Sequence, residues 1–72
     1  MSTRELIQSL PAEAREKLEA LKRNKNRFKE TGYESAEKEY RDMIRGYVSC
    51  LVDMGIIKQA QFRQLYIYYG IM

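Results

Sequence analysis

Residues 32 to 55, GYESAEKEYRDMIRGYVSCLVDMG, decide the fold, because two glycines enclose a segment whose apolar residues recur at helical spacing. The pattern predicts a helix from about Ser35 to Met54 that Gly55 closes. Gly46 lies inside this helix, where glycine costs about 1 kcal/mol relative to alanine, so we expect another backbone to approach it closely. The expected inward positions are Ala36, Tyr40, Met43, Ile44, Tyr47, Val48, Leu51, Val52 and Met54.

The segment before Gly32 carries a second helical stripe. Pro11 suits the first turn of a helix, and Gly32 suits the left-handed position just after its end. Lys25 interrupts the stripe, so we expect the last turns to leave the core or the lysine to run along the core edge. The apolar members of the stripe are Leu10, Ala14, Leu18, Leu21 and Phe28.

Two shorter helices complete the predicted fold. Ser2 and Glu5 have the spacing of a capping box, which predicts a first short helix, and residues 58–69 predict a last helix that Gly70 ends. The two long helices, each about 30 Å at 1.5 Å per residue, are joined by a few residues and should form an antiparallel hairpin. The sequence therefore predicts one all-α domain over residues 1–72. We expect a small three-helix bundle with a short N-terminal helix.

The composition excludes most catalytic chemistry. The chain has 72 residues, a formal net charge of +3, no histidine and one cysteine, Cys50. Without histidine, neither a Ser-His-Asp or Cys-His site nor a His-ligated metal site can form. We therefore expect no enzyme activity, metal or cofactor, and we expect Cys50 to be a small core residue. One unpaired cysteine and the lack of a signal-peptide hydrophobic region favour a cytoplasmic protein.

A basic run near the end of the first long helix is a candidate contact for nucleic acid or for an acidic protein. Five cations fall within eight residues: Lys22, Arg23, Lys25, Arg27 and Lys29. Such a cluster could neutralise phosphates without reading sequence. Cations also favour the C-terminal end of a helix, and an acidic stretch follows that could neutralise this run. The functional interpretation and this structural one both remain open.

Six tyrosines are the other excess, and three of them, Tyr33, Tyr40 and Tyr47, lie seven residues apart on one helix face. Tyrosine buries its ring while its hydroxyl stays in water, so this stripe fits either the edge of a small core or a protein interface. Arginine is also enriched at the centres of interfaces. The candidate protein-binding residues are Tyr33, Tyr40, Arg41, Arg45, Tyr47 and Tyr68.

The stretch from Tyr40 to Gly70, YRDMIRGYVSCLVDMGIIKQAQFRQLYIYYG, resembles small helical accessory proteins of Firmicutes phages and conjugative elements. Proteins of that style include small regulators and inhibitors of host defence, such as anti-CRISPR proteins. The resemblance implies an inhibitor or regulator, for example of a CRISPR effector nuclease, and it assigns no functional residue. We expect a non-enzymatic module that docks on a larger protein. Backbone contact with nucleic acid is the alternative, a second copy of the chain is a further candidate partner, and no membrane is expected.

Overall fold

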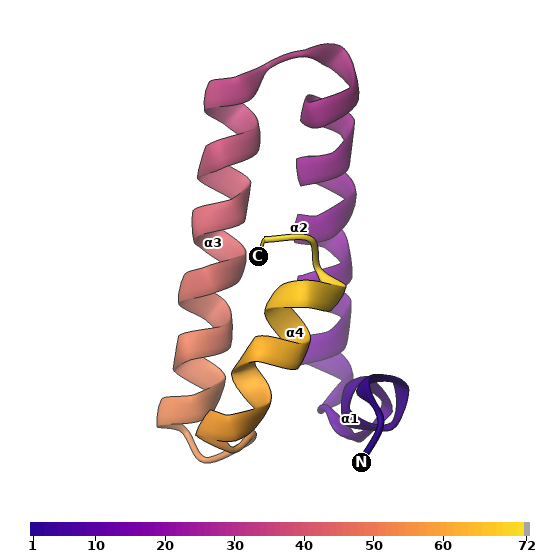
Figure 1. Ribbon diagram of the computed structural model, residues 1–72, viewed down its shortest axis with the longest axis vertical. Helices are drawn as coiled ribbons and strands as arrows, with labels where there is room; N and C mark the ends of the chain where they lie inside the picture. The colour runs from indigo at the N-terminus through magenta and orange to yellow at the C-terminus, as the bar shows by residue number, and fades with distance from the viewer. Residues whose placement is uncertain (72) are drawn as a thin grey trace.

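The computed structural model describes residues 1–71 as a bundle of helices (Figure 1). They are α1 (Thr3–Ser9), α2 (Ala12–Thr31), α3 (Glu34–Asp53), a 3₁₀ turn (Gln59–Gln61) and α4 (Phe62–Tyr68). Helices α2 and α3 form the antiparallel hairpin, α4 lies against the half away from the hairpin turn, and α1 lies at the far end of α2. The prediction of a small all-α bundle is therefore confirmed.

The hairpin turn is tight because Gly32 takes a left-handed conformation with φ of 80°. The amide of Tyr33 donates to the carbonyl of Phe28 across 3.0 Å, and the Gly32 amide donates to Lys29. This is the Schellman arrangement, in which the residue after the glycine also makes an apolar contact with the helix. The Tyr33 ring supplies that contact by meeting the Phe28 ring edge-on, with centroids 6.2 Å apart.

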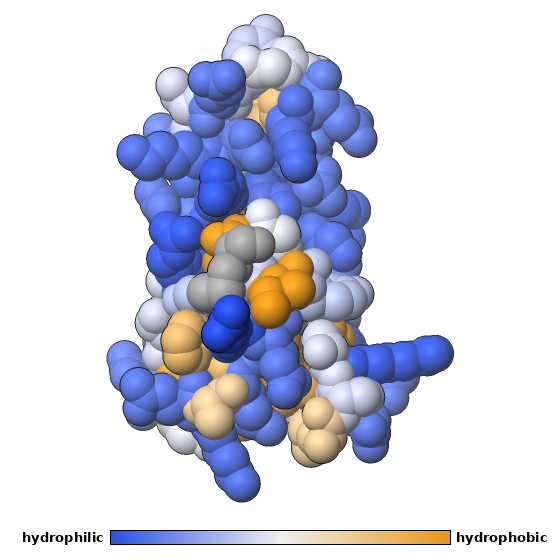
Figure 2. Space-filling view, viewed as in Figure 1, coloured by the Kyte–Doolittle hydropathy of each residue, from blue (hydrophilic) through white to orange (hydrophobic). Residues whose placement is uncertain are grey.

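The core lies where α1, α2, α3 and α4 meet. Its members in α2 and α3, and Leu10 just before α2, were expected from helical spacing, whereas Leu6, Ile7, Ile57 and Ile71 were not. On the face that Figure 2 shows, apolar side chains gather mainly around α4, whereas the half nearer the hairpin turn is mostly hydrophilic. The buried residues are Leu6, Ile7, Leu10, Ala14, Leu18, Leu21, Ile44, Val48, Leu51, Ile57, Leu65, Tyr69 and Ile71.

Four expectations for α3 are wrong. Met43 and Met54 are 49% and 66% exposed, and Cys50 is exposed rather than buried. A Cβ atom placed on Gly46 would meet nothing within 4 Å, so no backbone of the described residues approaches it closely. These three side chains are exposed because of their direction around the helix. At 100° per residue, Met43, Cys50 and Met54 lie about 80–120° from the buried Ile44. The other helices do not cover that part of the α3 surface.

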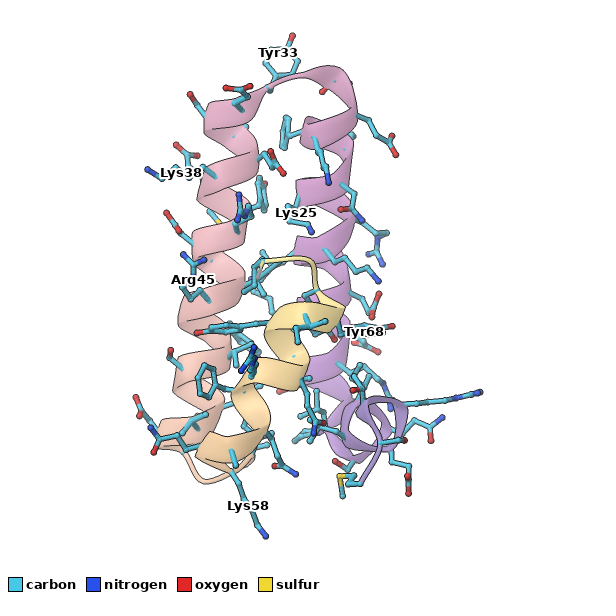
Figure 3. The ribbon with its side chains drawn as sticks, in the orientation of Figure 1. Lys25, Tyr33, Lys38, Arg45, Lys58 and Tyr68 are labelled. Carbon is cyan, nitrogen blue, oxygen red and sulfur yellow. The ribbon has the colours of Figure 1, made fainter. Side chains whose placement is uncertain are left out.

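Lys25 neither leaves the core nor runs along its edge. Its side chain is only 4% exposed, and its ammonium donates to the backbone carbonyls of Tyr69, at 2.6 Å, and Gly70, at 3.3 Å (Figure 3). From the opposite helix, Arg45 donates to the carbonyl of Ile71 at 3.2 Å. Cations from α2 and α3 thus hold the segment that follows α4, where helix geometry leaves carbonyls without partners.

Candidate functional site

The structure places the predicted protein-binding residues in separate regions rather than on one surface. Tyr33 is 64% exposed at the hairpin turn, Tyr68 lies beside α2, and Arg45 lies on α3, from which its guanidinium reaches the Ile71 carbonyl (Figure 3). Tyr40 and Tyr47 are only half-exposed and pack against the core. The ring of Tyr40 stacks on that of Phe28, with centroids 5.6 Å apart. The tyrosine stripe therefore lies along the edge of the core, and only Tyr33 projects fully from it.

The two candidate arginines of α3 are partly engaged within the chain. Arg45 pairs with Asp42 at 3.2 Å, in addition to its bond to the Ile71 carbonyl. Arg41 is half-buried, and its Nε has no hydrogen-bond partner among the described residues. Arg45 thus helps to hold the C-terminal segment through its bond to the Ile71 carbonyl.

Next to the tyrosines runs an apolar surface that we call the α3 outer face, made of Ala36, Met43, Cys50 and Met54. Together with Tyr40 and Tyr47 these residues alternate at spacings of four and three, as in the seam of a helix that packs along another helix. Cys50 and Met54 line a hollow of about 140 Å³ with residues at the start of α2. Val52, on the other side of α3, lines a hollow with α4 residues instead, and Asp53 borders the same hollow. The α3 outer face therefore points away from α4.

The edge of the α3 outer face that lies away from the core carries two carboxylates and a stretch of exposed backbone. Glu39, Gly46 and Asp53 are seven residues apart, so they follow one line along the helix, and all three are exposed. Gly46 leaves the backbone uncovered between the two carboxylates. The surface thus has an apolar centre and an acidic edge.

A second surface, the α1–α2 groove, has a volume of about 620 Å³. Its lining includes the nearly buried side chain of Ile7 from α1, and Tyr68 of α4 takes part in the lining. The Tyr68 ring is held by the Lys22 ammonium, 4.4 Å from its centroid, and by an edge-on contact with Tyr69. The charged residues that line the groove are Arg4, Arg15, Glu16, Glu19 and Arg23.

The three arginines of this groove are available for a ligand. Among the described residues, only Arg45 and Asp42 form an ion pair within 4 Å. No carboxylate of these residues therefore lies within 4 Å of the guanidinium of Arg4, Arg15 or Arg23. The sequence analysis included Arg23 and Tyr68 but missed Arg4, Arg15 and Ile7, because only the packing of α1 against α4 brings α1 to this side of α2. The spacing of Arg15, Glu19 and Arg23, four apart on one side of a helix, was the available signal.

The basic run does not form one strip. Lys25 is buried and bound to carbonyls, so the prediction that it contacts a partner is wrong. Lys22 covers Tyr68, Arg23 faces the groove, and the Arg27 guanidinium lies 5.3 Å from the Phe28 ring centroid. Lys29 is exposed. The cations are thus distributed around α2, which does not favour a single phosphate-binding surface.

Burial changes the titration of two groups in the core. The pKa of Lys25 is lowered chiefly because burial disfavours its charged form, and also by the positive charges of Lys29, Arg41 and Lys22, while Glu37 acts in the opposite direction. Burial also raises the pKa of the Tyr69 hydroxyl, which has no hydrogen-bond partner among the described residues. Both shifts thus follow from the burial of these two side chains.

Comparisons of the chain with protein-family models, curated proteins and solved structures find no match. Across residues 1–71, no three His, Cys, Asp or Glu side chains come together as metal ligands would. Within the same residues, no helix has the length and apolar character required to cross a membrane.

Proposed function

We propose that this protein is a non-enzymatic interaction module that docks its α3 outer face on a larger protein, as a small inhibitor or regulator would. The observation that carries the proposal is the exposure of Met43 and Met54 on a helix face whose apolar residues keep the spacing of a packing seam. Methionine is enriched at interface centres because its flexible side chain adapts to the opposing surface.

The edge of this face indicates the kind of partner surface. Glu39 and Asp53 would face basic side chains, which complement them and steer the approach. In an antiparallel pairing with a second copy, centred on Gly46, Glu39 would face the Asp53 position of the other chain. Like charges would then oppose each other, so a different protein with a basic edge fits better than a second copy.

Site-specific photocrosslinking tests the proposal. The chain carrying p-benzoylphenylalanine at position 43 is irradiated in nuclease-treated lysate of its native cells, with position 67 as the control, since Ile67 is 59% exposed on α4. We expect one discrete adduct from position 43 and none from position 67. An adduct from position 67 alone, no adduct from either position, or a crosslink to a second copy of this chain would overturn the proposal.

The captured partner then allows a quantitative test with matched variants. The double variant Met43→Glu and Met54→Glu should weaken binding to the purified partner by at least roughly thirtyfold, as loss of an interface centre does. Ile67→Glu makes the same chemical change on another face and should leave binding unchanged. Equal losses from both variants would contradict the placement of the site on α3.

A further inference from the structure

The α1–α2 groove has dimensions and charges that fit an extended peptide. Its volume of about 620 Å³ is in the range of sites that bury a ligand of about drug size, roughly 300–1,000 Å³. Arg15 and Arg23 are eight residues apart on α2 and are therefore separated by about 12 Å along the helix axis. In an extended chain, residues i and i+4 are separated by about 13 Å. Two side chains of one extended segment can thus reach both arginines.

The charges along the groove define what those side chains should be. Arg15 stands at one end, and Arg23 stands at the other with the Lys22 ammonium close by on the Tyr68 ring. Carboxylates at positions i and i+4 of a bound segment would meet these cations. Arginine binds carboxylates in a two-pronged geometry, which adds orientation to the attraction.

The middle of the groove requires a different side chain. Glu16 and Glu19 lie between the two arginines in the sequence of α2 and would repel a third carboxylate there. Ile7 and the Tyr68 ring offer apolar surface instead. In an extended segment, side chains i, i+2 and i+4 point to the same side, so an apolar residue at i+2 faces the groove together with the two acids.

We infer that the α1–α2 groove is a second binding site, which takes an extended protein segment of the pattern acid–x–apolar–x–acid. The supporting observations are the unpaired arginines, their separation along α2 and the apolar lining that Ile7 and Tyr68 supply. This site is distinct from the α3 outer face and does not depend on the function proposed for that face. A chain with both sites could hold two parts of one partner.

The test uses a synthetic peptide, acetyl-Gly-Glu-Ser-Leu-Ser-Glu-Gly-amide, titrated into the ¹⁵N-labelled full chain and followed by NMR. We expect saturable shifts at residues 3–8, 15–23 and 68. Replacing both glutamates of the peptide with glutamine should weaken binding roughly fivefold, as exposed ion pairs do. Replacing the leucine with serine should weaken it roughly tenfold or more. Equal binding of the glutamine peptide, shifts outside the groove, or no saturable binding would overturn the inference.

Variants of the protein separate a specific site from general charge attraction. Arg15→Ala and Arg23→Ala should each reduce the affinity for the peptide severalfold, whereas Arg27→Ala on the same helix should leave it unchanged. Equal reductions by all three would overturn the inference, because charge alone would then explain binding. The double variant Met43→Glu and Met54→Glu should still bind the peptide with unchanged affinity, so failure at one surface can be told from failure at the other.

Discussion

The ammonium group of Lys25 donates a 2.6 Å hydrogen bond to the backbone carbonyl of Tyr69, 44 residues later in the chain. This bond joins the middle of α2 to the end of α4, and the Arg45 bond to Ile71 joins α3 to the same segment. The position after a helix leaves carbonyls unpaired, and a buried carbonyl without a partner is costly. The lysine in the apolar stripe is therefore a structural residue that closes the bundle.

Replacing Lys25 with methionine tests that role. Lys25→Met keeps the length of the side chain but leaves the Tyr69 and Gly70 carbonyls without their donor, so we expect a loss of about 1–3 kcal/mol in the free energy of unfolding. Urea denaturation measures it. Lys29→Met, on the same helix but exposed, should change stability by less than about 0.5 kcal/mol. Equal stabilities of the two variants would show that the bond does not support the fold.

Tyr69→Phe should abolish one source of alkaline destabilisation. Because burial raises the pKa of Tyr69 above its ordinary 10.0, the folded chain keeps the proton that the unfolded chain releases above pH 10. The stability from this group is thus complete below pH 10 and falls as the pH rises further. At pH 11 we expect the wild type to have lost about 1.4 kcal/mol relative to the variant.

The same variant has a second expected outcome at neutral pH. The Tyr69 hydroxyl has no hydrogen-bond partner among the described residues, so removing it should leave the free energy of unfolding at pH 7 unchanged or higher. The comparison uses urea unfolding of both proteins at pH 7 and pH 11. The lowered pKa of Lys25 acts in the opposite direction, with stability rising toward pH 10.5, and cancels in the difference between the two proteins. A parallel pH dependence would contradict the prediction.

The helices could be predicted from the sequence because their signals are local. The capping box of Ser2 and Glu5 forms as its spacing indicates, and Gly32 ends α2 in the expected left-handed conformation. The surfaces could not be predicted, since they depend on which helix covers which arc of another. Met43 has the spacing of a core residue but no neighbour covers it, and Lys25 finds acceptors only because the chain after α4 folds back between the long helices.

Two tyrosines that look alike in the sequence should differ in their effect on stability. Tyr40 is half-buried and stacks on Phe28, so Tyr40→Ala should cost about 2–3 kcal/mol through lost burial and ring contact. Tyr33 is mostly exposed, so Tyr33→Ala should cost less than about 1 kcal/mol, although it removes the edge contact with Phe28. Thermal and urea unfolding compare the two. A larger loss for Tyr33 would show that the turn, rather than the Phe28–Tyr40 stack, stabilises this end of the hairpin.

Gly46 links stability to the proposed docking function, because it costs stability and nothing in the described chain packs on it. Gly46→Ala should raise the free energy of unfolding by about 0.5–1 kcal/mol, since alanine restricts the unfolded chain and favours the helix. Gly70→Ala should lower stability, because φ is 72° there and the new Cβ would lie 2.5 Å from the Lys25 Nζ. If a partner helix packs at Gly46, the more stable Gly46→Ala variant should give less photocrosslinked adduct from position 43. An undiminished adduct would mean that the partner contacts the methionines without approaching the backbone at Gly46.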